Sequence, residues 1–363
     1  MQRCVSKMSR GWRRYLYLLM DDLDQGTYPL RRIDASTLFF PPHQKKIPSS
    51  TIETVEARLP QPCISFTPTP AGYGTGGLDF FTLFGVGGNK SLIAGSDVNG
   101  FTVMYDLDKR TLHCPLSLNE PKQHGPISLA VGDALYVMDR SPLPDSRCGF
   151  EALVYDPEQA KVTPDTQEWQ WHRLPPPPYV LAPGHIPTPI TGYTVVGGSS
   201  IWVSTPGIGT YSFDTSTGTW SKAGKWVLPF RGRADYFPEY NLWLGFSSKS
   251  SLLCSWDLST AVKPSLHSSL EEDMLKSKSE GCTLKYSHLV HMGSGKFCVA
   301  KFFERVYYEP PPKGYRDYIW PQIERFAVFI GYEMDLIGPG GELRMRKHKS
   351  RRYMTNTTHG WVF

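Results

Sequence analysis

A glycine-rich stretch is the first group of residues in this sequence that suggests chemistry, because such loops can wrap phosphate groups. Residues 72–77 satisfy the pattern G-x-G-x-x-G through Gly72, Gly74 and Gly77. Nucleotide binding requires a strand before this loop and a helix after it, so that the phosphate meets a helix N-terminus. The run 78–84 that follows is typical of a strand instead. We therefore predict a flexible loop here and no bound cofactor.

Potential metal ligands are present but poorly arranged. His288 and His291 are three residues apart, a spacing that suits a metal on a helix, yet the segment 286–292 is typical of a strand, where residues three apart face opposite sides. The segment 22–26 carries two aspartates of a calcium loop without the remaining ligands, and an acidic turn explains it. The seven cysteines occur singly, without C-x-x-C. We expect no metal site, and free thiols in a reducing compartment.

Catalytic motifs are the next group to consider. The pattern G-x-S-x-G does not occur, and a Cys–His pair cannot be argued from one sequence. Paired carboxylates of a glycosidase are defined by their separation in space, which the sequence does not give. The sequence therefore assigns no catalytic residue.

Basic residues gather at both ends of the chain. The net charge is +5, but the first fourteen residues hold five cations and no acid, and the segment 344–352 holds six. Without these eleven the body carries −6, so the basic balance describes the ends alone. The possible basic contact patch comprises Arg344, Arg346, Lys347, Lys349, Arg351 and Arg352.

This basic segment has two interpretations. Its composition resembles a nuclear-localisation or phosphate-contacting patch. Its alternation with Leu343 and Met345 favours an ordinary edge strand with a solvated basic face. No aromatic residue interrupts the run before Tyr353, so base stacking is not implied, and we do not expect nucleic acid as the partner.

Composition indicates the elements that must position any site. The 33 glycines and 31 prolines among 363 residues argue for many short strands joined by turns, and 13% aromatic residues fit half-buried sheets. The early apolar run 15–20 has only six residues, too few for a secretory signal or a membrane span. We interpret it as a strand. An organelle transit peptide within the acid-free first twenty residues is the alternative.

An apolar residue followed by Asp recurs at strand ends, which indicates a repeat. The Asp side chain can accept N–H bonds from the following turn, and in four cases a second apolar residue comes seven positions after the first, as expected for a hairpin. The five pairs are Ile33-Asp34, Tyr105-Asp106, Tyr155-Asp156, Phe213-Asp214 and Trp256-Asp257, and the second apolar residues are Phe40, Leu112, Val162 and Trp220.

One unit is complete, from Val195 through Gly197-Gly198 and Phe213-Asp214 to Trp220, which is the order of a kelch-type β-propeller blade. Periods of about 40–50 residues with about four strands each are typical of propellers. We predict an all-β, kelch-like propeller of six blades, with seven as the neighbouring possibility. The N- and C-terminal strands would close it, with the run 15–20 and the segment near Leu343 as candidates. An irregular pair of β-sandwiches is the alternative fold.

The predicted domain organisation follows from this repeat. Residues 1–12 would form a flexible basic extension, 13–353 a single propeller domain with a polar insertion at about 265–281, and 354–363 a C-terminal tail. The proline-rich stretches 175–178 and 310–312 are interpreted as stiff crossings between blades, with recognition by SH3- or WW-type modules as the alternative.

The sequence resembles an uncharacterised plant family, much expanded in cereals, with kelch-like propeller features. The resemblance begins near Met8 and covers essentially the full length. It rests on these stretches: Met8-Ser9, 13–16, 30–34, 174–180, 193–230, 289–290, 293–298 and 343–351. The family implies a propeller but no known activity. Plant kelch propellers often follow an F-box, and a strand that begins by Tyr15 leaves no room for one, which puts a ubiquitin-ligase adaptor role in doubt.

These observations favour a non-enzymatic propeller that binds an unknown partner protein inside a plant cell, in the cytoplasm or nucleus. We expect a monomer with no membrane association. The first alternative is an enzyme, of hydrolase or oxidase type, with its site in the central propeller channel. The second is a nuclear or nucleic-acid-associated protein acting through its basic ends. Carboxylates or histidines lining the channel would favour the enzyme, and an Arg-rich surface would favour binding.

Overall fold

The regular secondary structure of the described residues is almost all β-strand. The structure, a computed structural model, describes residues 12–41, 54–69, 77–114, 117–123, 125–144, 149–158, 168–259, 264–269, 281–309, 320–337 and 342–363. Most of the glycine-rich loop 72–77, the N-terminal extension up to residue 11 and the polar insertion beyond Ser269 lie outside these residues. Two short 3-10 helices, η1 (Ala35–Leu38) and η3 (Pro178–Leu181), accompany the strands. The all-β fold class is thus confirmed.

The chain divides into two compact units. The first unit combines residues 1–67 with 270–363, and the second spans residues 68–269. Within the described residues, none of the helices has the length and apolar character needed to cross a membrane.

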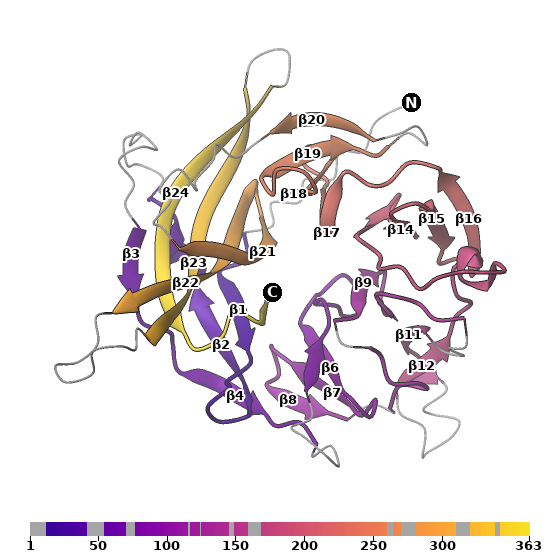
Figure 1. Cartoon of the computed structure of the whole chain (residues 1–363), viewed down its shortest axis with the longest axis horizontal. Helices are drawn as coiled ribbons and strands as arrows, with labels where there is room; N and C mark the ends of the chain where they lie inside the picture. Colours follow the sequence, from indigo (N-terminus) through magenta and orange to yellow (C-terminus); the bar gives the residue numbers. More distant parts are fainter. Residues whose placement is uncertain are drawn as a thin grey trace. The chain divides into compact units, whose positions relative to one another are not determined.

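The second unit contains four antiparallel groups of four strands, each group consecutive in sequence (Figure 1). The first two groups are separate sheets. The third and fourth join into one eight-stranded sheet through a parallel pairing of β13 with β17. The strands are β5 (Leu78–Phe80), β6 (Leu92–Asp97), β7 (Thr102–Asp106), β8 (Thr111–His113); β9 (Ile127–Val131), β10 (Ala134–Met138), β11 (Phe150–Tyr155), β12 (Trp169–Arg173); β13 (Gly192–Val196), β14 (Ser200–Thr205), β15 (Gly209–Asp214), β16 (Thr219–Gly224); β17 (Phe230–Phe237), β18 (Leu242–Ser247), β19 (Leu253–Asp257) and β20 (Ser265–Ser269).

Aromatic side chains pack each of these groups against the next. Phe84 meets Trp169 edge-on with ring centroids 5.3 Å apart, which links the first group to the second. Phe150 meets Phe213 edge-on with ring centroids 4.9 Å apart, which links the second group to the third. The buried Trp202 lies in one cluster with strands of the fourth group. Burial of such large apolar surfaces is the main stabilising contribution, which explains the aromatic-rich composition.

The first unit contains two sheets. One has the order β25-β1-β2-β4 and the other the order β21-β22-β23-β24-β3. Their core includes Leu16 and Leu18 from the first sheet and Phe302, Phe329 and Tyr353 from the second. The strands are β1 (Tyr15–Met20), β2 (Tyr28–Asp34), β3 (Thr54–Ala57), β4 (Pro62–Phe66), β21 (Cys282–Gly293), β22 (Lys296–Glu309), β23 (Trp320–Ile337), β24 (Glu342–Thr355) and β25 (Gly360–Val362).

The C-terminal residues are not a tail. Strand β25 pairs antiparallel with β1, and Val362 and Phe363 are buried. The segment 354–363, predicted as a tail, thus contains the strand that pairs with β1, whereas the segment near Leu343, one of the two candidates for closure, lies on β24 in the other sheet. The two apolar residues at the chain end explain the outcome, since exposing them would be unfavourable.

The predicted Asp turns are present wherever the structure describes them fully. In two hairpins the apolar residues seven apart are directly paired, Tyr105 with Leu112 and Phe213 with Trp220. The carboxylates accept turn N–H bonds as follows: Asp34 from Ser36, Asp106 from Asp108 and Lys109, Asp214 from Ser216 and Thr217, and Asp257 from Ser259. After Asp34, however, the chain enters η1 instead of the predicted hairpin to Phe40.

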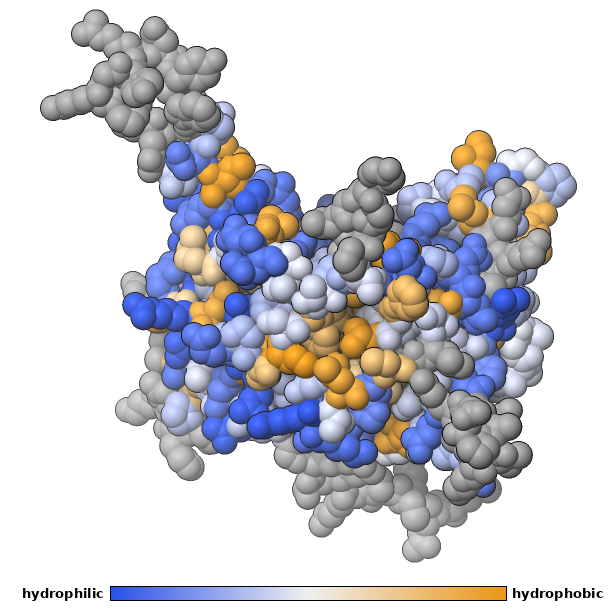
Figure 2. Space-filling view, turned by 90° about the horizontal axis from the view of Figure 1, so that it is seen from below, coloured by the Kyte–Doolittle hydropathy of each residue, from blue (hydrophilic) through white to orange (hydrophobic). Residues whose placement is uncertain are grey.

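Two pairs of glycines adopt backbone conformations that favour glycine. Gly197 and Gly198 have φ of +63° and +77°, and Gly87 and Gly88 have +64° and +78°. Only glycine adopts this left-handed conformation without steric cost, so each pair reverses the chain after an apolar segment. On the face shown in Figure 2, a central group of hydrophobic residues and several smaller ones lie among hydrophilic residues.

Candidate functional site

The predicted basic patch lies on β24, where most of its charges are engaged. Arg352 contacts Glu324 at 2.7 Å and stacks over the Phe326 ring at 3.9 Å. Arg346 forms an ion pair with Glu333, and the ammonium of Lys349 lies 5.3 Å from the centroid of the Phe40 ring.

The edge-strand interpretation of this segment is wrong for its C-terminal part. From Ser350 to Tyr353, β24 pairs with β23 on one side and in parallel with β3 on the other. Ser350 is almost fully buried, and Arg344 is exposed. The alternation of apolar and basic residues could not reveal β3, which lies nearly 300 residues earlier in the sequence. The other five basic residues are half-buried along β24.

The other residues singled out from the sequence do not converge either. His288 and His291 lie on β21 as predicted, and burial lowers the pKa of His288 to about 4. Asp22 closes an acidic turn by accepting N–H bonds from Asp24 and Gln25. Among the described residues, no three His, Cys, Asp or Glu side chains form a group able to hold a metal ion.

A different set of polar side chains does converge, in the second unit. The first strands of its groups are neighbours: β9 lies beside β13, and β13 pairs with β17. The loop after β5 joins them, because the Thr82 N–H donates to the Ser128 hydroxyl on β9 at 2.9 Å. The side chains gathered here, called the cationic cluster below, are Thr82, Lys90, Arg140, Tyr193, Arg233 and Asp235.

Arg233 is the centre of the cationic cluster. Its guanidinium contacts the Asp235 carboxylate at 2.5 Å and also donates to the Thr82 hydroxyl. A β-bulge between Arg231 and Asp235 and a φ of +74° at Gly232 shape this part of β17. Because bulges change the direction of side chains, this irregularity positions Arg233 toward its neighbours on the other strands.

Arg140 is positioned by a second series of contacts. Its Nε donates to the carbonyl of Gly125 at 2.8 Å, and the N–H of Gly125 donates to the Asp79 carboxylate at 3.2 Å. The preceding segment is fixed by the buried Glu151, which accepts from the N–H of Asn119 at 2.9 Å. Arg140 is thereby held beside the Tyr193 hydroxyl, its side-chain hydrogen-bond partner.

The electrostatics of the cationic cluster favour an anion. Lys90, Arg140 and Arg233 carry three positive charges, against the carboxylates of Asp235 and of Asp79, which accepts from the N–H of Gly125, so one positive charge is in excess. Surrounding protein lowers the pKa of Lys90, and the nearby Arg233 lowers it further, although the Lys90 side chain remains exposed to solvent. Burial raises the pKa of Tyr193, while Arg140 and Arg233 oppose that rise.

An incoming carboxylate would find free donors here. Among the described residues Lys90 forms no hydrogen bond or ion pair, although its charge interacts with Arg233 and Asp235. Bringing a carboxylate beside Lys90 would reduce the repulsion between the two cations and create a charge-assisted hydrogen bond. The cationic cluster can therefore hold a negatively charged side chain.

The sequence analysis missed the cationic cluster because its members are far apart in the chain, from Thr82 to Asp235. One local signal was available. Gly232 interrupts an otherwise strand-like segment between two arginines, and a glycine inside a strand often marks a bulge. Which other residues would meet that bulge depends on the order of the sheets.

Comparisons with known proteins give a family and weak structural likenesses. The β-propeller domain of Cps50 (Swd1) from Myceliophteria thermophila is 10% identical with a TM-score of 0.41, over 92% of this chain and 83% of that chain. YCF48 from Cyanidioschyzon merolae is 9% identical with a TM-score of 0.35, over 74% and 84%. A structural-genomics protein of unknown function from Bacteroides thetaiotaomicron is 8% identical with a TM-score of 0.37, over 76% and 79%.

In sequence, no curated protein matches the chain. The model of a family described as protein of unknown function, DUF1668, matches residues 13–353. This match spans nearly the whole chain, and the chain therefore belongs to the DUF1668 family.

Proposed function

We propose that the chain is a six-bladed, kelch-like β-propeller that binds a partner protein and is not an enzyme. The four groups of strands in the second unit and the two sheets of the first supply six sets of at least four strands. The pairing of β25 with β1 is the kind of contact by which a terminal strand completes a blade. The resemblance to a plant family supports an intracellular role in a plant, in the cytoplasm or nucleus.

The observation that carries the proposed function is the cationic cluster. It combines three cations from separate strand groups with a tyrosine and leaves Lys90 free to bind. Loops and strand ends on a rigid scaffold commonly carry binding residues. We propose that an Asp- or Glu-containing segment of the partner places a carboxylate beside Lys90.

Affinity purification of the tagged protein from plant cells, followed by mass spectrometry, tests this function. The bait would be compared with Lys90→Glu and with a matched control, Lys109→Glu, whose side chain is 76% exposed elsewhere in the same unit. A protein partner retained by the wild type and the control at low and at high salt, but depleted with Lys90→Glu, is the expected result.

Three other results would contradict the proposal. A partner bound equally by Lys90→Glu would place the interface elsewhere. Partners lost after nuclease treatment would favour the basic ends and nucleic acid, because phosphate contacts weaken steeply with salt. Absence of any specific partner at either salt concentration would favour the enzyme alternative, and substrate screening would follow.

A further inference from the structure

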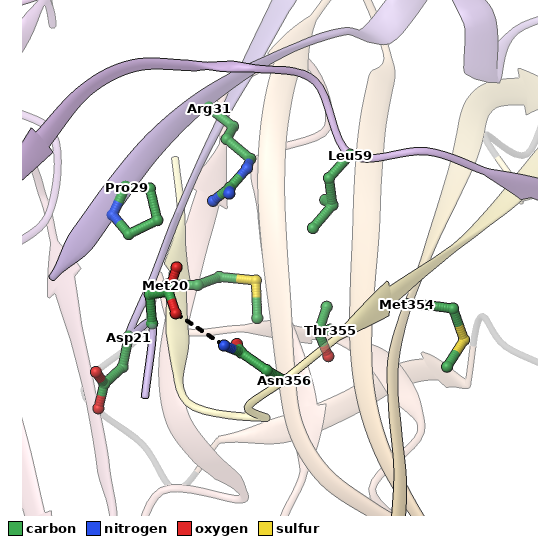
Figure 3. Close-up of a pocket in the computed structure, with 9 residues that line it drawn as sticks. Met20, Asp21, Pro29, Arg31, Leu59, Met354, Thr355 and Asn356 are labelled. Carbon is green, nitrogen blue, oxygen red and sulfur yellow. Dashed lines mark hydrogen bonds between the residues drawn. The ribbon is translucent and has the colours of Figure 1, made fainter. Parts of the chain in front are cut away.

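The first unit contains a pocket that the proposed function does not use. It has a volume of about 310 Å³ and opens between the ends of β1 and β24, the middle of β2 and the segment after β3. That volume is near the lower end for small-molecule sites. In Figure 3, Arg31 and Leu59 enter from one side, and Met20, Thr355 and Asn356 lie opposite.

The pocket walls are largely apolar. Met20, Pro29, Leu59 and Met354 contribute thioether and hydrocarbon surface. Methionine side chains are flexible and polarisable, so two of them can adapt to apolar groups of different shape. This lining suits a hydrocarbon or thioether group of modest size.

Arg31 indicates what the polar end of a ligand must carry. The Nε of Arg31 is buried and has no hydrogen-bond partner among the described residues. Burial lowers the pKa of Arg31, whereas nearby Asp22 raises it. A buried donor without an acceptor is costly, and a guanidinium matches the two oxygens of a carboxylate. The neighbouring Arg32 differs, because it is exposed and its guanidinium stacks over the Tyr15 ring at 4.4 Å.

Asp22 indicates which second charge a ligand of this pocket must carry. Its Oδ1 accepts bonds from the N–H groups of Asp24 and Gln25 and from the side-chain amide of Asn356 at 2.9 Å. Its Oδ2 has no hydrogen-bond partner within the described part of the chain. Asp21 also lines the pocket, but its carboxylate points away from Arg31 in Figure 3. A simple anion placed against Arg31 would therefore be repelled by Asp22, and a simple cation placed against Asp22 would be repelled by Arg31. A ligand with both charges satisfies both groups.

We propose that this pocket binds a free α-amino acid with an apolar side chain of the size of leucine or methionine. The ligand carboxylate accepts from Arg31, the ammonium donates to Asp22 Oδ2, and the side chain packs against Met20, Leu59 and Met354. This site lies within the first unit and is independent of the cationic cluster, so either can fail without the other.

Isothermal titration calorimetry with chemically trimmed probes tests the proposal on the full chain. L-leucine and L-methionine are compared with 4-methylpentanoate, which lacks the ammonium, and with 3-methylbutylamine, which lacks the carboxylate. We expect saturable binding of the two amino acids and affinities at least about tenfold weaker for both analogues, because each loses one charge-assisted contact. Equal binding of either analogue, or no heat with either amino acid at millimolar concentration, would overturn the proposal.

Two variants assign the binding to the pocket. Arg31→Leu is expected to weaken leucine binding by about tenfold or more. The matched control Arg32→Leu, on the opposite face of β2, should bind as the wild type does. Equal loss in both variants would refute a role for Arg31. The probe series on the wild-type chain remains decisive if Arg31→Leu does not fold.

Discussion

Among single residues of the second unit, Glu151 is a fully buried carboxylate that is paired with a buried ammonium. It is fully buried and contacts the ammonium of Lys122 at 2.5 Å, and it also accepts bonds from Asn119. Replacing Glu151 by Ala would remove the carboxylate beside the buried Lys122 ammonium, which would keep its hydrogen bond to the Glu120 carbonyl. Breaking a buried pair in this way costs about 3–5 kcal/mol.

Urea denaturation should therefore show that Glu151→Ala lowers the free energy of unfolding by about 3–5 kcal/mol. The control is Glu168→Ala, an exposed carboxylate in the same unit. A loss for Glu151→Ala no larger than for the control would mean that Lys122 reaches water or another partner. Glu151 also holds the segment before Gly125, and the Gly125 carbonyl accepts from Arg140. Glu151→Ala should therefore displace Arg140 and weaken binding of the proposed partner.

His348 links the stability of the first unit to pH. The backbone N–H of Phe40 donates to its Nδ1 at 3.1 Å, so Nδ1 carries no proton and Nε2–H is left to face Glu333 at 3.2 Å. Burial lowers the pKa of His348 to about 4, and Arg346 and Lys296 contribute to the decrease.

The sign of the pH effect follows from this shift. The unfolded chain binds the His348 proton near the ordinary histidine pKa of about 6.5, and the folded chain only near 4. The contribution to stability is thus complete above about pH 6.5 and is lost as the pH falls toward 4. Thermal melts at pH 7 and pH 5 should show a smaller loss of Tm for His348→Gln than for the wild type. If wild type and His348→Gln lost the same amount of Tm between pH 7 and pH 5, His348 would not titrate in this range.

At the scale of elements, the Asp residues at strand ends stabilise the turns of the hairpins. Asp214 accepts N–H bonds from Ser216 at 2.8 Å and Thr217 at 3.3 Å, immediately before β16. Asp214→Ala removes this acceptor and should lower the free energy of unfolding by about 1 kcal/mol. Asp214→Asn keeps an oxygen at the same position and should restore most of that loss in denaturant titrations. If Ala and Asn were equivalent, the turn bonds would not contribute measurably.

How far the sequence predicts an element depends on how local its determinants are. The run 15–20 forms a strand within the predicted limits, and the turns at Asp106 and Asp214 form as expected, because the interacting groups are a few residues apart. The parallel pairing of β24 with β3 and the gathering of Lys90 with Arg233 depend on contacts far along the chain. A single sequence contains no local signal for such pairings.

At the scale of the whole molecule, the two units differ in how the chain builds them. The second unit is continuous from residue 68 to 269, whereas the first needs both ends of the chain. The N-terminal and C-terminal segments pair at β1, where Tyr17 and Phe363 exchange backbone hydrogen bonds of 3.0 and 2.9 Å. The sheet of β1 is therefore incomplete until residues 360–363 have been synthesised.

Deleting residues 360–363 should therefore destabilise the first unit selectively. Burial of the Val362 and Phe363 side chains contributes about 1.5–3 kcal/mol each, so the loss should be about 3–6 kcal/mol. Hydrogen exchange followed by mass spectrometry should show faster exchange in β1, while strands such as β14 of the second unit keep their protection. A chain lengthened by four Gly and Ser residues after Phe363 is the control, since it retains β25. Unchanged exchange in β1 after the deletion would mean that the pairing with β25 does not stabilise the N-terminal sheet.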